Sequence, residues 1–303
     1  MRLTRSVAEL SEARLELSTG DHRRTVALVP TMGALHAGHR SLIRLARQLA
    51  DVVVVSIFVN PLQFGPDDDY ARYPRVLEDD LVACEQEGVD VVFAPSVTAL
   101  YPSGRQVTLS AGPLGSVLEG ASRPGHYDGV LTITSKLINL VGPDKVVIGK
   151  KDPQQLAVIR KMAVDLNCDV DIVAGPLVRD HDGLALCGRN RFLLPHQRTT
   201  AQALYAALRA AGRHSGVEAA LASAREVLDL AGRGGHLRVD YVALVHPQTF
   251  APLPEDYQGQ GLLLIAARVG DTRLTDHIEL RLARPAVGAE PLLGVDLSQP
   301  VSI

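Results

Sequence analysis

Short apolar runs alternate with amphipathic segments over the first 175 residues of the chain. Residues 52–59 are apolar on both faces apart from Ser56, which is typical of a central strand in a parallel sheet. From Gly38 the apolar side chains Leu42, Leu45 and Leu49 recur at helical spacing. We therefore expect strands at 25–29, 52–59, 89–93, 145–148 and 170–173, and helices from 38 and at 75–88, 129–141 and 153–166.

These repeated strand–helix–strand units predict an α/β fold with a doubly wound, Rossmann-like parallel sheet covered by helices on both faces. The remainder has a different pattern, with helices expected at 199–211 and 217–231 and then strands at 238–245, 261–269 and 273–282. That order predicts a smaller α+β domain, which we expect to cover the active site. We place the domains at 1–177 and 178–303, and expect the Pro- and Gly-rich residues 284–303 to form a loose tail.

The composition is that of an ordinary globular chain, with 46% apolar and 21% charged residues. The 31 Lys and Arg against 34 Asp and Glu leave a formal charge of −3, which gives no reason to expect a nucleic acid or a membrane as partner. Glu9 interrupts any signal-peptide core, and no apolar run approaches the roughly 20 residues that span a bilayer. Three scattered cysteines favour a reduced, cytoplasmic protein.

The stretch from Pro30 to His39, PTMGALHAGH, joins an expected strand to an expected helix, where ligands of such sheets bind. Its glycines allow close approach of the backbone, and a helix N-terminus favours a phosphate. His36 and His39 are three residues apart, so both face the same way on a first helical turn and can donate hydrogen bonds to phosphate oxygens. Two other interpretations of these histidines remain. One histidine can cap the helix while the other lies at the surface, or the two can bind a metal ion together.

Polar side chains also follow the later strands. Asn60 and Gln63 are amides that can bind a carboxylate, hydroxyl or amine, although Asn-Pro is also an ordinary turn. Lys151 can bind a phosphate and Asp152 a ribose hydroxyl, or these residues only start a helix. Arg189 follows a loop of small residues. This pattern is typical either of a site that binds an anion or of a surface turn.

Three carboxylates, Asp79, Asp80 and Glu119, are candidates for holding Mg²⁺, but we favour solvated helix faces for them. From the residues alone, the prediction is a nucleotide-using α/β enzyme.

The same stretches resemble the pantothenate synthetase (pantoate–β-alanine ligase) family, whose members are nucleotidyltransferases with a His-x-Gly-His signature. The similarity spans about residues 25 to 255. It is carried by VPTMGALHAGH, SIFVNPLQFG, RYPR, RPGHYDGV, VVIGKKDPQQL, LCGRNRFL and DYVALVHPQTFAPL.

The resemblance implies a two-step reaction. ATP and pantoate form a pantoyl adenylate with loss of pyrophosphate, and the amine of β-alanine then attacks the acyl carbon to give pantothenate and AMP. It also implies Mg²⁺ with the ATP, and a homodimer.

By the same resemblance, His39 is the donor to the reacting phosphate, His36 assists it, and Lys151 and Arg189 contact the phosphates. Substrate binding is implied for Gln63, Gln155 and Asn60. Binding of ATP is implied for Met32, Gly33, Ala34, Leu35, His36, Ala37, Gly38, His39, Gly149, Lys150, Lys151, Asp152, Val178, Leu186, Cys187, Gly188 and Arg189.

The sequence departs from the family pattern where two serines usually stand, at Cys187 and Gly188, and where a glutamate usually stands, at Lys150. One hypothesis is that the charge of Lys150 partly compensates for the missing hydroxyls. Two alternatives stay open. The first is a degenerate paralogue with weak or altered activity, and the second is a related nucleotidyltransferase, which would not explain Gln63 together with Gln155.

Overall fold

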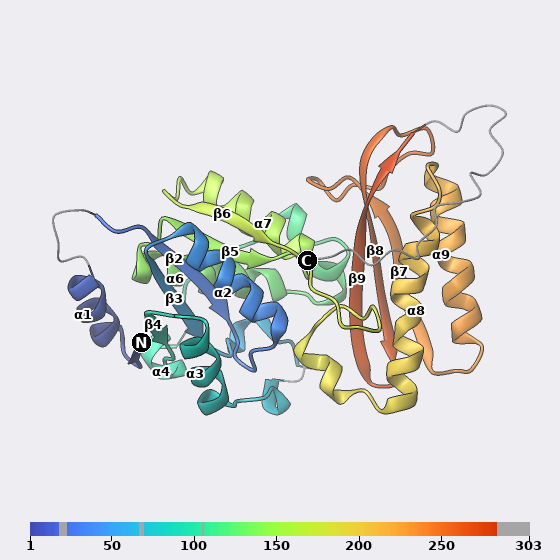
Figure 1. The fold of residues 1–303 in the computed structure, drawn as a ribbon. Helices are drawn as coiled ribbons and strands as arrows, with labels where there is room; N and C mark the ends of the chain where they lie inside the picture. The colour runs from blue at the N-terminus through green and yellow to red at the C-terminus, as the bar shows by residue number, and fades with distance from the viewer. Residues whose placement is uncertain (18–22, 67–69, 105, 284–303) are drawn as a thin grey trace.

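The computed structural model describes residues 1–17, 23–66, 70–104 and 106–283 of the chain. A six-stranded sheet with its helices lies beside a three-stranded sheet that carries two helices (Figure 1). This arrangement confirms the expected α/β fold with a smaller C-terminal α+β domain. The expected tail at 284–303 lies outside the described residues.

The six-stranded sheet has the order β1-β4-β3-β2-β5-β6, and every neighbouring pair is parallel. The chain moves from β2 through β3 to β4 in one direction and then returns to place β5 on the other side of β2. The order therefore reverses between β2 and β5, which is where ligands of doubly wound sheets bind. The strands are β1 (Arg2–Thr4), β2 (Val26–Thr31), β3 (Val52–Ile57), β4 (Val91–Phe93), β5 (Lys145–Gly149) and β6 (Asp171–Gly175).

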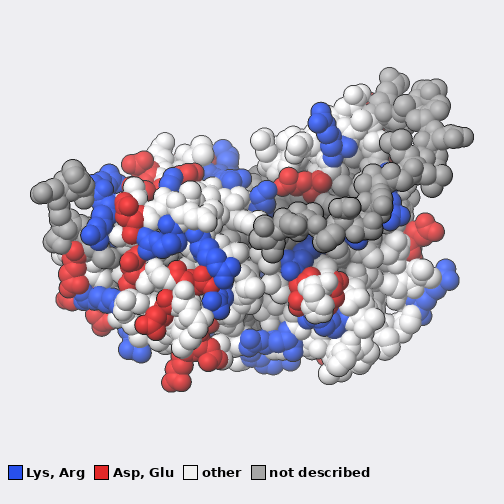
Figure 2. Space-filling view, in the orientation of Figure 1, with Lys and Arg blue, Asp and Glu red and all other residues white. Residues whose placement is uncertain are grey.

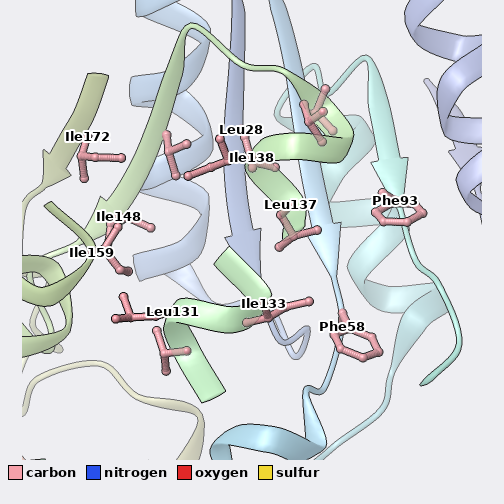
Figure 3. Packing of buried hydrophobic residues seen from close by; sticks show 14 of the residues in the cluster. Leu28, Phe58, Phe93, Leu131, Ile133, Leu137, Ile138, Ile148, Ile159 and Ile172 are labelled. Atoms are coloured by element: carbon pink, nitrogen blue, oxygen red, sulfur yellow. The ribbon is translucent and has the colours of Figure 1, made fainter. Parts of the chain in front are cut away.

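Helices cover both faces of this sheet, because successive residues of the central strands point to opposite sides. Leu28 of β2 packs with α1, α6 and α7, as Figure 3 shows for Leu137 and Ile138 of α6, whereas Val29 packs with α2 and α3. The helices are α1 (Val7–Leu17), α2 (Ala37–Leu49), α3 (Leu77–Gln86), α4 (Val97–Leu100), α5 (Glu119–Ser122), α6 (His126–Val141) and α7 (Pro153–Asp165).

The first strand and helix were not expected from the sequence. β1 is only three residues long and is placed by its parallel pairing with β4, in which Leu3 lies opposite Val92. So short a strand has no period that a sequence pattern can reveal. Its partner is almost 90 residues away along the chain.

The smaller sheet is antiparallel, with the order β7-β8-β9. Leu204 and Leu208 of α8 pack with Leu263 and Ile265 of β8 to form its core. In Figure 1, β9 is the strand nearest to the six-stranded sheet. The elements are α8 (Pro195–Ala211), α9 (Val217–Gly232), β7 (Leu237–Val245), β8 (Gly259–Val269) and β9 (Thr272–Leu282).

Charged side chains of both signs are mixed on the face shown in Figure 2. Arg40 and Arg44 of α2 both pair with Glu87, and Arg47 pairs with Asp90. Within the described ranges, no helix has the length and apolar character needed to cross a membrane.

Candidate active site

A cavity of about 760 Å³ opens where the carboxyl ends of β2 and β5 face β9. The lining brings together most of the site residues predicted from the sequence, so segments far apart in the chain meet at the switch point of the sheet. These are Met32, His36, Gly38, His39, Asn60, Gln63, Gly149, Lys151, Asp152, Gln155, Val178, Leu186, Cys187, Gly188 and Arg189. Five other predicted residues, Gly33, Ala34, Leu35, Ala37 and Lys150, do not line it.

The two histidines form the cap of α2. Nδ1 of His36 accepts a hydrogen bond from the Gly38 N–H at 3.2 Å, and Nδ1 of His39 accepts one from the His36 N–H at 3.4 Å. A neutral imidazole that accepts at Nδ1 carries its proton on Nε2. The cap therefore fixes the same tautomer in both rings, whose centroids are 4.1 Å apart.

Burial keeps both rings neutral. It lowers the pKa of His39 to about 3, with the neighbouring His36 as a smaller cause. Burial also lowers the pKa of His36, and the charges of Arg191 and Lys151 act in the same direction. Near neutral pH the start of α2 thus presents two Nε2–H donors at the cavity, an arrangement suited to a phosphate.

The loop before α2 is held by Asp80 of α3. The Ala34 N–H donates to one oxygen of this carboxylate at 3.0 Å, and the Leu35 N–H donates to the other at 2.7 Å. Asp80 is only 2% exposed, so the solvated helix face that we favoured for it is wrong. The amides of Ala34 and Leu35 are directed at a side chain, and they shape the loop from behind the cavity wall.

Replacing Gly33 with alanine is expected to destabilise the fold by about 1–3 kcal/mol. Gly33 has φ +80°, and an added Cβ would lie 2.8 Å from Oδ2 of Asp80. Gly235 offers a matched control, because it has φ +73° but nothing within 4 Å of an added Cβ. Urea unfolding of both variants would measure the difference, and equal losses would show that the contact with Asp80 is unimportant.

Gln63 is held in place by its neighbours. Its Nε2 donates to Sδ of Met32 at 2.8 Å, and its Oε1 accepts from Nδ2 of Asn60 at 3.3 Å. Asn60 is 1% exposed; it also donates to the Gly129 carbonyl, accepts from the Tyr101 hydroxyl and caps the short helix Pro61–Gln63. Asn60 therefore orients Gln63 as well as lining the cavity.

The turn after β5 places three more predicted residues at the cavity. Nζ of Lys151 donates to both the carbonyl and the hydroxyl oxygen of Thr275 on β9, each at 2.9 Å. Asp152 caps α7 by accepting the Gln155 N–H at 2.9 Å. Burial raises the pKa of Asp152, and the charge of Glu119 adds to this effect.

Lys150 is directed away from the cavity. Its Nζ lies 3.1 Å from Oε1 of Glu279, and both side chains are well exposed, at 39% and 54%. The hypothesis that Lys150 compensates for Cys187 and Gly188 therefore has no support in this geometry. A serine would fit at position 188, since an added Cβ there would meet only Tyr73 Oη at 3.7 Å.

A buried ion pair that the sequence did not reveal connects helix α5 to the three-stranded sheet. Arg273 of β9 binds both oxygens of Glu119 at 2.6 and 2.7 Å, and its Nε donates to Asp240 at 2.7 Å. Tyr241 donates to Oε1 of Glu119 at 2.7 Å. Burial alone would raise the pKa of Glu119, but Arg273 and Tyr241 outweigh it and the pKa is lowered. The solvated face favoured for Glu119 is therefore also wrong.

Arg123 is a second residue that the sequence analysis missed, although it lies in the RPGHYDGV stretch. Arg123 lines the cavity beside Gln63. Nη2 of Arg123 donates to the Gln63 carbonyl at 3.2 Å, and Nη1 of Arg123 lies 3.1 Å from Nε2 of His126. A guanidinium in this position is suited to a carboxylate. Within the described residues, no group of three or more His, Cys, Asp or Glu side chains is placed to hold a metal ion.

Comparison with known proteins finds the same family over most of the chain. A family model described as "Pantoate-beta-alanine ligase" matches residues 2–279, a range that contains every residue lining the cavity. Pantothenate synthetase of Thermobifida fusca (strain YX) is 51% identical over 289 residues, which cover 92% of this chain and 96% of that protein. Pantothenate synthetase of Mycolicibacterium smegmatis is 51% identical over 278 residues, which cover 90% and 86%.

Solved structures extend this similarity to the fold. Pantothenate synthetase from Thermus thermophilus superposes with a TM-score of 0.84 at 43% identity, covering 92% of this chain and 99% of that one. A pantoate-beta-alanine ligase from Francisella tularensis, complexed with beta-gamma ATP and beta-alanine, has a TM-score of 0.76 at 30% identity. The second match covers 92% of this chain and 97% of that one.

Proposed function

We propose that this chain, which belongs to the pantoate-beta-alanine ligase family, condenses pantoate with β-alanine at the expense of ATP. The carboxylate of pantoate attacks the α-phosphate of ATP, and pyrophosphate leaves. The amine of β-alanine then attacks the acyl carbon of the pantoyl adenylate. AMP leaves, and the product is pantothenate.

The observation that carries this proposal is the meeting of two kinds of side chain in one cavity. His36, His39 and Lys151 supply hydrogen-bond donors and a positive charge for phosphate groups. Gln63 and Gln155 supply amides for a small polar acid in the same space. A related nucleotidyltransferase that keeps the nucleotide on its product would not explain Gln63 and Gln155 together.

In the first step, negative charge develops on the oxygens around the α-phosphorus atom. We assign the Nε2–H of His39 to this phosphate and that of His36 to its neighbour, since the cap fixes both donors before the substrate arrives. Lys151 and Arg189 contact the remaining phosphates as charged donors. No covalent enzyme intermediate is required, because orientation of the two reactants supplies much of the acceleration.

The rest of the nucleotide lies along the turn after β5. We assign the ribose to Gly149 and Asp152 and the adenine to the apolar side chains of Val178 and Leu186. Mg²⁺ accompanies ATP and neutralises the charge of its phosphates. This ion is typically held by the phosphates of a substrate together with few protein ligands. The resemblance also implies a homodimer, which stays a prediction. The cytoplasmic location inferred from the cysteines and the domain boundary after residue 177 inferred from the change of pattern stay predictions too.

Gln155→Ala is expected to weaken pantoate binding about 5- to 150-fold, the effect of losing about 1–3 kcal/mol of hydrogen bonding. ATP binding should stay nearly unchanged. The backbone N–H of residue 155, which bonds Asp152, is retained in this variant. Calorimetric titration with each ligand would measure both affinities, and an equal loss for the two ligands would indicate that Gln155 supports the fold instead.

The proposed reaction is tested by incubating the protein with ATP, Mg²⁺, pantoate and β-alanine and following pyrophosphate, AMP and pantothenate. Omission of β-alanine should still permit pyrophosphate release, up to about one equivalent per site, with no pantothenate. A product that keeps the nucleotide would favour the related nucleotidyltransferase. Binding of ATP and pantoate without any turnover would favour the degenerate paralogue.

A further inference from the structure

Tyr127 is a buried residue of α6 that none of the roles above includes. It is 1% exposed and does not line the cavity. Its hydroxyl oxygen lies 3.1 and 3.2 Å from the two carboxylate oxygens of Asp152 and 3.3 Å from Oε1 of Gln154. The hydroxyl thus stands directly behind the carboxylate that we assign to the ribose.

We propose that Tyr127 is a positioning residue for nucleotide binding, which sets the orientation of the Asp152 carboxylate so that it can accept a ribose hydroxyl. This inference rests on the function proposed above.

The geometry restricts the Asp152 carboxylate from two sides. The Gln155 N–H donates to Oδ1 at 2.9 Å, and the Tyr127 hydroxyl is within reach of both oxygens. Rotation of the carboxylate about its Cβ–Cγ bond would break these contacts. With both donors present, the carboxylate is held in one orientation toward the cavity that it lines.

The Tyr127 hydroxyl is suited to act as a hydrogen-bond donor at all times. Burial raises its pKa, and the charges of Asp152 and Glu119 raise it further, so the hydroxyl keeps its proton at every ordinary pH. The other nearby acceptor, Gln154, is fixed by its own bonds, because its Nε2 donates to the carbonyls of Leu114 and Val117 at 2.9 and 2.8 Å. The position of Tyr127 is therefore determined independently of any nucleotide.

The test removes the hydroxyl with Tyr127→Phe and compares ATP with 2′-deoxy-ATP and 3′-deoxy-ATP. Wild type should discriminate against at least one of the two analogues. In the variant we expect the KM for ATP to rise about tenfold, the size of losing one hydrogen bond to a charged group, while the KM for pantoate stays within about twofold. The preference for ATP over the deoxy analogue should shrink by a similar factor, because the oriented acceptor for that hydroxyl is lost.

Tyr241→Phe is the matched control. It also removes a tyrosine hydroxyl, in a partly buried position, but one that bonds Glu119 and not Asp152. This control should leave the ratio of kcat/KM for ATP to kcat/KM for the deoxy analogue unchanged, even if it lowers the melting temperature. A purely structural role for Tyr127 would instead raise both KM values and leave the discrimination as in wild type, which would overturn the inference.

Titration of wild type and Tyr127→Phe with AMP, 2′-deoxy-AMP and 3′-deoxy-AMP gives a readout that needs no turnover. If wild type forms no pantothenate, the proposed function fails, and these titrations still decide whether Tyr127 acts on ribose recognition. If pantothenate forms but the variant discriminates as wild type does, only the inference about Tyr127 is wrong.

Discussion

Replacing His39 with alanine is expected to slow pantoyl-adenylate formation about 100- to 1000-fold, the effect of removing one preorganised donor worth roughly 3–4 kcal/mol to the transition state. The Nε2–H of this ring is fixed before substrate binds, since its Nδ1 already accepts the His36 N–H. Pyrophosphate release at saturating ATP and pantoate measures the effect. A rate within threefold of wild type would rule out His39 as the donor to the reacting phosphate.

The alanine variant also loses an acceptor of the α2 cap, so stability must be separated from catalysis. His39→Gln serves as the control, because a glutamine three residues after a cap can accept the same backbone N–H. This variant should unfold at the same urea concentration as wild type and still lack the imidazole donor. Recovery of the full rate in His39→Gln would show that the cap, rather than the imidazole, is what the reaction needs.

Arg273→Ala is expected to destabilise the protein by about 3–5 kcal/mol, because it leaves the Glu119 carboxylate buried without its partner. Glu119 and Arg273 side chains are only 11% and 14% exposed, so solvent screens the pair weakly. The variant also removes the bond to Asp240 of β7, which ties β9 to another strand of the same three-stranded sheet. Equilibrium unfolding in urea, followed by circular dichroism, measures the loss.

A double variant tests the cause of this loss. Glu119→Gln with Arg273→Met removes both charges while keeping similar side-chain volumes, and it should recover most of the stability. If the double variant is as unstable as Arg273→Ala, the loss comes from packing rather than from an uncompensated charge. If Arg273→Ala lowers the free energy of unfolding by less than about 1 kcal/mol, the ion pair contributes no more to stability than an ordinary surface ion pair.

Much of the six-stranded domain could be predicted because its strands are buried on both faces. The apolar run that contains β3 and the glycine and histidine residues after β2 are local signals, and they predict a site at the edge of the sheet where the cavity opens. The resemblance then assigned roles to individual side chains. Those roles stay predictions, but the structure brings most of the assigned residues into one cavity.

What escaped prediction depends on contacts between distant residues. Asp80 was recognised as a carboxylate, yet its partners are amides 45 and 46 residues away. Glu119 and Arg273 are separated by 154 residues, so nothing near either one indicates a pair. Lys150 and Lys151 are adjacent and chemically identical. Only the direction of the backbone after β5 determines that Lys150 faces Glu279 and that Lys151 faces the cavity.

The histidine cap of α2 limits how the sequence can drift. At position 36 a serine or an asparagine would also cap the helix, but neither would present an imidazole Nε2–H beside that of His39. At position 39 a glutamine would complete the cap and lose the ring. Substitutions that folding alone would tolerate at these two positions would therefore remove the donors that we propose for the phosphates. The start of α2 can thus stay intact in a variant that has lost the proposed activity.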